Sequence, residues 1–497
     1  MADTTTPNYG LTKPEVGASE DTWGTKINTN LNLIDTQMKV SDDRSATNTT
    51  TANAALPKAG GTMTGNIATA GITSVTLGSG NFVAGSTAGD SIVSGGDNNT
   101  LVGTNAGTAI TTGDRNTALG VDALNDVTTA SYNTAIGTYA GQSITTGATN
   151  TAVGDAALAS TTTASDNTAV GQGSLNANIT GASNTAVGRN ALTTNTTGAY
   201  NTANGFDALK SNTTGTENVA VGQAALNTNT TASNNTAVGA AALYYNTTGA
   251  NNVAVGKSAL VDNTTAANNV AIGYEAGRSI TTSASNVYIG YQAGRSTTTS
   301  YGSNVAIGQN AFYTNTTGYS QTAVGGAALF SNTSGIESTA LGYQALYSNT
   351  TASKNTAVGH YALYTNTTGA NNVAVGASAL LANTTGADNT AVGSGCLDSN
   401  TTGNDNVAVG RLALEFNTTA DDNVAMGFLA LRYNTTGSDN VGMGSRALNQ
   451  NTTGSNNSAI GSSALQNCTT GSSNIAVGLN AGSAITTGLN NTFIGRD

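Results

Sequence analysis

The sequence predicts a mostly β protein, a parallel β-solenoid with 17-residue coils that is preceded by a short N-terminal helix. A pentapeptide of the form N-(T/V)-A-V-G recurs 24 times, and its final glycines are 17 residues apart except for one spacing of 18. Seventeen residues are too few for a helix-pair repeat or a propeller blade and suit one solenoid coil. All three prolines lie in the first 57 residues, and a long proline-free stretch favours continuous β structure because proline removes ladder hydrogen bonds.

Residues 1–39 differ from the repeats and contain the only Trp of the chain. Residues 19–38 predict a capped helix, with Ser19 or Asp21 as the N-cap. Its apolar residues form a heptad stripe that is too short to be stable alone, so it needs partner chains or a docking surface. The predicted attachment residues are Trp23, Ile27, Leu31, Ile34 and Met38.

Residues 40–98 are predicted to be a linker followed by a transition into β structure. Residues 40–55 have the composition of a linker, residues 56–67 place turn glycines between short apolar stretches, and residues 68–98 are Gly-rich and weakly β. The solenoid rod is predicted to span residues 99–497, as 24 coils.

The consensus coil reads N-(T/V)-A-V-G-x-x-A-L-x-x-N-T-T-G-x-x, and its residues are numbered here as positions 1 to 17. Alternation predicts a strand in which Val253 and Val255, at positions 2 and 4, face one side and Ala254 the other. The nearly constant Ala at position 3 implies a tight space. A second strand is predicted at positions 8 and 9, and the N-T-T-G segment is predicted to turn the chain, with Gly available for a positive φ.

Positions 9 and 12 vary together. Most coils have Leu at position 9 and Asn at position 12, whereas a second type has Gly and Ile there, as in Gly107 with Ile110. The exchange predicts that both sites fill one core volume. Gly294 with Thr297 departs from both types and lies in the single 18-residue coil, where we expect a bulge or bend.

Asn occupies position 1 in 22 of 24 coils, with Gln321 and Ser338 as the departures. Stacked coils place these amides about 4.8 Å apart, which predicts hydrogen-bonded amide ladders. The apolar filling of one coil is thin, at one Ala, one Val, one Ala and one Leu. A homotrimer is therefore predicted, because three parallel copies bury the spare apolar face of a narrow rod.

Composition argues against an enzyme and against a nucleic-acid binder. Only 9% of residues are charged and the net charge is −11, without a basic stripe. His360 has no recognisable triad partner and is expected to be an exposed surface residue, and no metal or cofactor motif is found around Cys396 and Cys468. A weak alternative is a glycosidase pair drawn from the acidic residues at variable surface positions, which include Asp398, Glu415, Asp421 and Asp422.

Four aromatic residues occupy position 10 in successive coils, namely Tyr313, Phe330, Tyr347 and Tyr364. Stacked at coil spacing, they would line a glycan-binding stripe, form a stabilising ladder or fill a trimer interface. The structural interpretations are favoured.

Residues 14–35 resemble the virion-attachment segment of bacteriophage tail fibres, and L-P-K-A-G-G-T-M-T-G (56–65) resembles a short motif of the same proteins. The repeat resembles the V-A-I-G repeats of trimeric autotransporter adhesin heads, and similar repeats occur in phage tail fibres. Those heads are trimers of left-handed parallel β-rolls, so the resemblance implies this architecture. The N-terminus has no basic and apolar leader and the chain no run of about 18 apolar residues, which favours a phage protein over an adhesin.

The resemblance implies a structural tail fibre on the virion, made in the host cytoplasm and taking part in host adsorption. Its expected partners are two further copies of the chain, a tail hub or adaptor protein at the N-terminus, and a glycan or protein receptor on the host surface. Because the sequence stops within its last repeat, we expect either a removed C-terminal part or a separate tip protein. The alternatives are a bacterial trimeric surface adhesin, less favourably a polysaccharide-degrading tailspike, and last an ice-binding solenoid.

Overall fold

The computed structural model describes residues 4–5, 12–13, 32–34, 36, 78–298 and 301–496. The chain divides into two compact units, Met1–Val75 with Val83–Ser86, and Thr76–Phe82 with Thr87–Asp497. In the first unit, β1 (Thr4–Thr5) pairs antiparallel with β2 (Thr12–Lys13). Residues 32–34 and 36 are helical, and the rest of the helix predicted at 19–38 lies outside the described residues.

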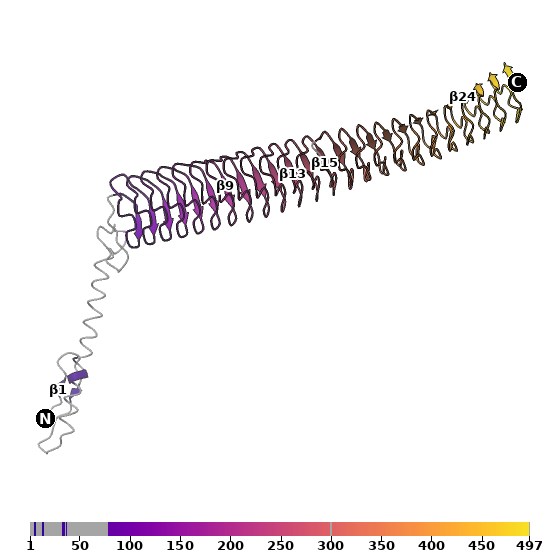
Figure 1. Ribbon diagram of the computed structural model, residues 1–497. Coiled ribbons are helices and arrows are strands. Elements are labelled where there is room, and N and C mark those ends of the chain that lie inside the picture. The colour runs from indigo at the N-terminus through magenta and orange to yellow at the C-terminus, as the bar shows by residue number, and fades with distance from the viewer. Residues whose placement is uncertain are drawn as a thin grey trace. The chain divides into compact units, whose positions relative to one another are not determined.

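The second unit is a parallel β-solenoid in which each coil contributes one three-residue strand (Figure 1). Except at the two ends of the solenoid, each strand pairs in register with those of the preceding and following coils, so equal positions stack; Val253 lies between Thr236 and Val270. The strands are β3 (Phe82–Ala84), β4 (Thr100–Val102), β5 (Thr117–Leu119), β6 (Thr134–Ile136), β7 (Thr151–Val153), β8 (Thr168–Val170), β9 (Thr185–Val187), β10 (Thr202–Asn204), β11 (Val219–Val221), β12 (Thr236–Val238), β13 (Val253–Val255), β14 (Val270–Ile272), β15 (Val287–Ile289), β16 (Val305–Ile307), β17 (Thr322–Val324), β18 (Thr339–Leu341), β19 (Thr356–Val358), β20 (Val373–Val375), β21 (Thr390–Val392), β22 (Val407–Val409), β23 (Val424–Met426), β24 (Val441–Met443), β25 (Ser458–Ile460), β26 (Ile475–Val477) and β27 (Thr492–Ile494).

The second strand predicted at positions 8 and 9 is wrong, because these residues form turns. Position 9 has a left-handed backbone even when it is Leu, with φ of 52° at Leu243 and 50° at Leu260. Position 7 is left-handed as well, as at Ala241 with φ 56°. Left-handed residues at positions 7 and 9 reverse the chain within a few residues and bring the Leu side chain back into the coil.

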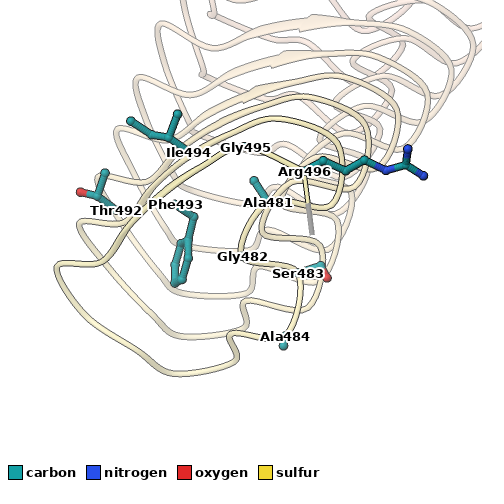
Figure 2. Close-up of a pocket in the computed structure, with 9 residues that line it drawn as sticks. All are labelled: Ala481, Gly482, Ser483, Ala484, Thr492, Phe493, Ile494, Gly495 and Arg496. Atoms are coloured by element: carbon teal, nitrogen blue, oxygen red, sulfur yellow. The ribbon is translucent and has the colours of Figure 1, made fainter.

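The alternation predicted for the strand is confirmed, and it places only position 3 inside. Ala254 is fully buried, whereas Val253 and Val255 are half-buried on the outer face. In the last coil, Phe493 points into the coil while Thr492 and Ile494 point outward (Figure 2). The Val that was expected to fill the core of each coil therefore lies on the surface, and Ala at position 3, Ala at position 8 and Leu at position 9 form the core.

The shared volume of positions 9 and 12 is confirmed. A Cβ on Gly107 would lie 2.8 Å from Cδ1 of Ile110, so a side chain at position 9 and Ile at position 12 exclude each other.

The 18-residue coil has neither Leu at position 9 nor Ile at position 12, and one large residue at position 3 fills the core volume in their place. The ring of Tyr288 is fully buried and occupies the space beside Gly294, where a Cβ would lie 2.5 Å from the ring atom Cδ1. Its hydroxyl lies 3.2 Å from Thr297 Oγ1, and burial raises the pKa of Tyr288 to about 12. The expected bulge is absent from the strands themselves, because β15 pairs in register with both neighbours. The extra residue falls after Thr298, which still donates its N–H to the equivalent Thr316 carbonyl.

The amide ladder predicted at position 1 is confirmed. Asn252 donates its backbone N–H to Asn235 Oδ1 at 3.0 Å, and Asn269 donates to Asn252 Oδ1 at the same distance. The Asn252 Nδ2 donates to the Ala266 carbonyl at 2.9 Å, which ties the start of the coil to its last turn. These asparagines are fully buried, so the ladder satisfies polar groups that no water reaches.

A second amide ladder runs along position 12. Asn246 Nδ2 donates to Asn229 Oδ1 at 2.9 Å and to the Gly249 carbonyl at 2.9 Å. The acceptor oxygens of Asn263 and Asn451 are buried and unpaired, because the coils that follow them have Ile280 and Cys468 at position 12. The ladder therefore breaks where the sequence departs from Asn.

Residues 81–98 repeat the coil one turn before the 24 copies found in the sequence. Asn81 Oδ1 accepts from the Asn99 backbone N–H at 2.7 Å, and Phe82 N–H donates to the Asn99 carbonyl. The sequence pattern conceals this coil, because its strand reads F-V-A instead of T-A-V and its glycine lies 18 residues before Gly103.

We expect Cys468→Ser to stabilise the rod by about 1 kcal/mol, since the new hydroxyl supplies a donor to the unpaired Asn451 oxygen and leaves no amide oxygen facing Ile485 of the following coil. Hydrogen exchange of the amides around residues 444–488 should slow, and the melting temperature should rise. The control is Cys396→Ala, which removes the other buried thiol at position 8 and restores the consensus residue without touching a ladder. Equal protection in the two variants would contradict this role of the hydroxyl.

Candidate functional site

The aromatic residues at position 10 form a continuous stack, which we call the aromatic ladder (Tyr313, Phe330, Tyr347 and Tyr364). Position 10 follows the buried position 9, so these side chains emerge on the surface and are half-buried. The coil spacing sets the ring spacing: each neighbouring pair has centroids 5.1 Å apart, with interplanar angles of 2°, 8° and 16° along the chain. The structure therefore brings all four predicted residues together.

Stacking covers most ring faces of the ladder. Phe330 and Tyr347 each have a parallel ring on both sides, so they present only edges to solvent. On the N-terminal side, the guanidinium of Arg295 lies over the ring of Tyr313, 5.6 Å from its centroid. A glycan that stacks its apolar face on an aromatic ring needs an open ring face, which the middle of the ladder does not offer.

The C-terminal end of the ladder is open. After Tyr364, position 10 is occupied by Leu381, and a cavity of about 420 Å³ lies between them. Tyr361 packs edge-on against Tyr364 with centroids 5.2 Å apart and forms one wall. The lining is completed by Thr365, whose hydroxyl already donates to the Leu381 carbonyl at 2.7 Å, and by Ala382. This end of the ladder thus presents an apolar pocket beside a tyrosine ring.

Tyr361 connects the pocket to a second aromatic group at position 6. His360 is exposed, stacks on Tyr343 with centroids 5.6 Å apart and contacts Tyr361. The expected exposed position of His360 is confirmed, and its neighbours are aromatic rather than acidic. Sequence reasoning missed this group, although Tyr343 and His360 occupy the same position in consecutive coils.

The N-terminal end of the ladder is anchored by an ion-pair network around Glu275. Glu275 accepts from Arg278 at 2.8 Å, from Arg295 Nε at 2.9 Å and from Gln292 at 2.8 Å. Burial by itself raises the pKa of the Glu275 carboxyl, but the hydrogen bonds from Arg295 and Gln292 and the positive charge of Arg278 outweigh it, so the pKa lies below its ordinary value. The network holds Arg295 over Tyr313.

The acidic residues considered as a glycosidase pair fall into two groups. Asp398 and Glu415 occupy position 10 in consecutive coils, whereas Asp421 and Asp422 lie at positions 16 and 17. Burial and the charge of Glu415 raise the pKa of Asp398. Glu415 is held by Arg432 Nε at 2.5 Å, and Asp421 accepts from the Asn404 backbone N–H at 2.7 Å. Glu415 and Asp421 therefore already have protein partners.

A second surface feature is an apolar strip, formed by the position-4 side chains on the outer face of the strands. Position 4 is Val, Ile, Leu or Met in 23 of the 24 repeats found in the sequence, with Asn204 as the departure. More than a third of the side chain is exposed in Leu119, Ile136, Val238, Ile272, Ile307, Leu341, Val392, Met426, Met443, Ile460, Val477 and Ile494. A contiguous apolar surface of this length is typical of an interaction site.

The last coil has a cavity of about 470 Å³, lined by residues 481–484 and 492–496 (Figure 2). The ring of Phe493 points toward Gly482 there, where a Cβ would lie 2.6 Å from the ring. The cavity thus opens beside core residues of the last coil.

Of the predicted attachment residues, only Ile34 is described. It is helical and about half exposed, and Trp23, Ile27, Leu31 and Met38 lie outside the described residues. In the part of the chain that the structure describes, no helix has the length and apolar character to cross a bilayer. No family model, curated protein or solved structure matches this chain.

The carboxyls of Glu275 and Asp398 are expected to act on stability with opposite signs. Because the Glu275 pKa is lower in the folded state, the ionised group contributes stability that is complete above the unfolded-state pKa of about 4.3 and is lost as pH falls through the folded-state value. The raised pKa of Asp398 means that its ionised form opposes folding above that pKa.

Glu275→Gln should therefore lower the melting temperature at pH 7 and reduce its decline in acid, whereas Asp398→Asn should raise it at pH 7. Thermal melting between pH 3 and 7 measures both variants, and each serves as the charge control for the other. A decrease of similar size in the melting temperatures of both variants at pH 7 would contradict the opposite effects assigned to the two carboxylates.

Proposed function

We propose that the protein is a structural phage tail fibre, a homotrimer of left-handed solenoids that projects from the virion and takes part in host adsorption. The N-terminal segment attaches to a tail hub or adaptor protein, a proposal that rests on the resemblance of residues 14–35. The rod acts through reach and stiffness rather than turnover. Twenty-four coils at about 4.8 Å each give a length on the order of 115 Å.

The apolar strip is the observation that carries the trimer. Its side chains recur once per coil, so a parallel copy of the same chain matches the strip coil for coil over its whole length. Burial of apolar surface in water is favourable by roughly 25 cal/mol per Å². A cyclic assembly closes when every copy contributes the same surface, and three narrow rods around one axis enclose their strips.

The pocket beside Tyr364 is our proposed receptor contact. It is the open end of the aromatic ladder, and the neighbouring Tyr343, His360 and Tyr361 extend the aromatic surface around it. A tyrosine face that no parallel ring covers, with an apolar floor beside it, suits the apolar face of a sugar ring in a host-surface glycan. Three copies present three such pockets, and simultaneous contacts multiply weak affinities.

The trimer is tested by the native mass of the purified full chain, which we expect to be three times 49.0 kDa. Val238→Asp with Val255→Asp places charges in the strip and should shift the mass toward the monomer. The control carries the same charges at exposed position-14 sites of neighbouring coils, Thr248→Asp with Thr265→Asp, and should remain trimeric. A monomeric native chain would overturn the proposal.

The receptor contact is tested with virions that carry Tyr364→Ala or Phe330→Ala fibres. Removing the open ring should reduce adsorption to the host by about tenfold, in the range expected from losing one aromatic contact of roughly 0.5–1.5 kcal/mol in each of several copies. Phe330 has both ring faces covered, so its loss should lower thermal stability and leave adsorption unchanged. Normal adsorption with Tyr364→Ala fibres would leave the ladder with a structural role alone.

A further inference from the structure

In a trimer built on the apolar strip, the strip alone does not determine how the three chains are aligned along the axis. Because position 4 is aliphatic in almost every coil, shifting one chain along its neighbours by one coil replaces each apolar contact by an equivalent one and loses contact only at the ends. Repetitive sheets with little side-chain variety are prone to such slippage. Something in the strip has to distinguish the aligned assembly from the shifted ones.

Asn204 is the polar exception in the strip. It is the last residue of β10, is exposed on the outer face and stacks between Val187 and Val221 in the sheet. Its backbone is held like that of every other coil, since its carbonyl accepts from Gly222 N–H. Its side chain makes no hydrogen bond with any other described residue, so the amide is available to a partner.

We infer that Asn204 fixes the axial register of the assembly, and the inference rests on the proposed trimer. In the aligned trimer the three Asn204 amides lie at one level and hydrogen-bond one another. A shift by one coil moves each amide against Val187 or Val221 of a neighbouring copy, where its donors and acceptors are buried without partners. Unpaired buried amides are costly, and a single Asn in an apolar seam fixes register in coiled coils by the same physics.

The other irregular coils discriminate less. Coils that exchange Val for Ile, Leu or Met at position 4 replace one apolar side chain by another, which a neighbouring strip accommodates at low cost. The extra residue of the 18-residue coil falls after Thr298, outside the strand that carries the strip, and Ile289 keeps its place between Ile272 and Ile307. Asn204 therefore provides the clearest difference between aligned and shifted strips.

The register is measured with cysteine pairs in two differently tagged full-length chains that are co-expressed. One chain carries Val358→Cys and the other Val375→Cys, one coil apart in the strip and far from Asn204. Disulfides need Cβ atoms about 3.5–4.5 Å apart, which resolves a one-coil shift. The native Cys396 and Cys468 are fully buried and give little background.

With Asn204 present, oxidation should link residue 358 to 358 and 375 to 375, and links between 358 and 375 should be rare. Asn204→Val should raise the 358–375 links by about tenfold, the ratio set by a free-energy difference of about 1.4 kcal/mol. The matched variant Asn204→Val with Val221→Asn moves the amide by one coil in every chain and should restore aligned links. Melting curves of the three proteins show that each is folded.

The two proposals fail differently. A trimer that stays aligned in Asn204→Val chains overturns the role of Asn204 and leaves the trimer intact. A chain that sediments as a monomer and forms neither kind of link overturns the trimer, and the register device with it.

Discussion

The pairing of buried polar groups from coil to coil is the constraint on which the rest of this structure depends. A coil of 17 residues encloses too little apolar volume to be stable alone, and its interior contains whole asparagine side chains. Asn252 shows how the conflict is resolved: its side-chain amide donates to the preceding coil and to its own last turn, and accepts from the following coil. The solenoid therefore has no stable single-coil form, and its stability arises from nearest-neighbour interfaces.

The same interfaces offset backbone strain that every coil carries. A left-handed backbone costs a residue other than Gly roughly 1–2 kcal/mol, and most coils contain three such residues, at positions 7, 9 and 17. Leu260 accepts this cost at position 9 because the turn places its side chain in the core and its N–H on the Ala276 carbonyl of the next coil. Strain in a coil is thus tolerated only while its neighbours are in place.

Periodicity made the solenoid, the strand alternation and the position-1 ladder predictable from sequence alone. The turn at positions 8 and 9 was not, because A-L has no turn composition and Leu is unexpected at a positive φ. Alternation separates two faces without saying which is inside, so the side chain at position 4 was placed wrongly in the core. The members of the aromatic ladder were evident from their spacing, whereas its closed N-terminal end and open pocket depend on Arg295 and Leu381, which no repeat pattern marks. The attachment residues stay a prediction, since only Ile34 is described.

The direction of the ladders has a mechanical consequence. The hydrogen bonds between coils point along the axis of the solenoid, so tension on the rod loads the coil interfaces in series, and the weakest one yields first. Because the chain continues through every interface, a coil that detaches is not lost but unwinds. Its 17 residues then extend to about 56–61 Å in place of a rise of about 4.8 Å. Under tension, the solenoid is therefore expected to lengthen stepwise and to dissipate energy at each step. The first steps are expected at interfaces such as that between Gln321 and Ser338, where the amide ladder is interrupted.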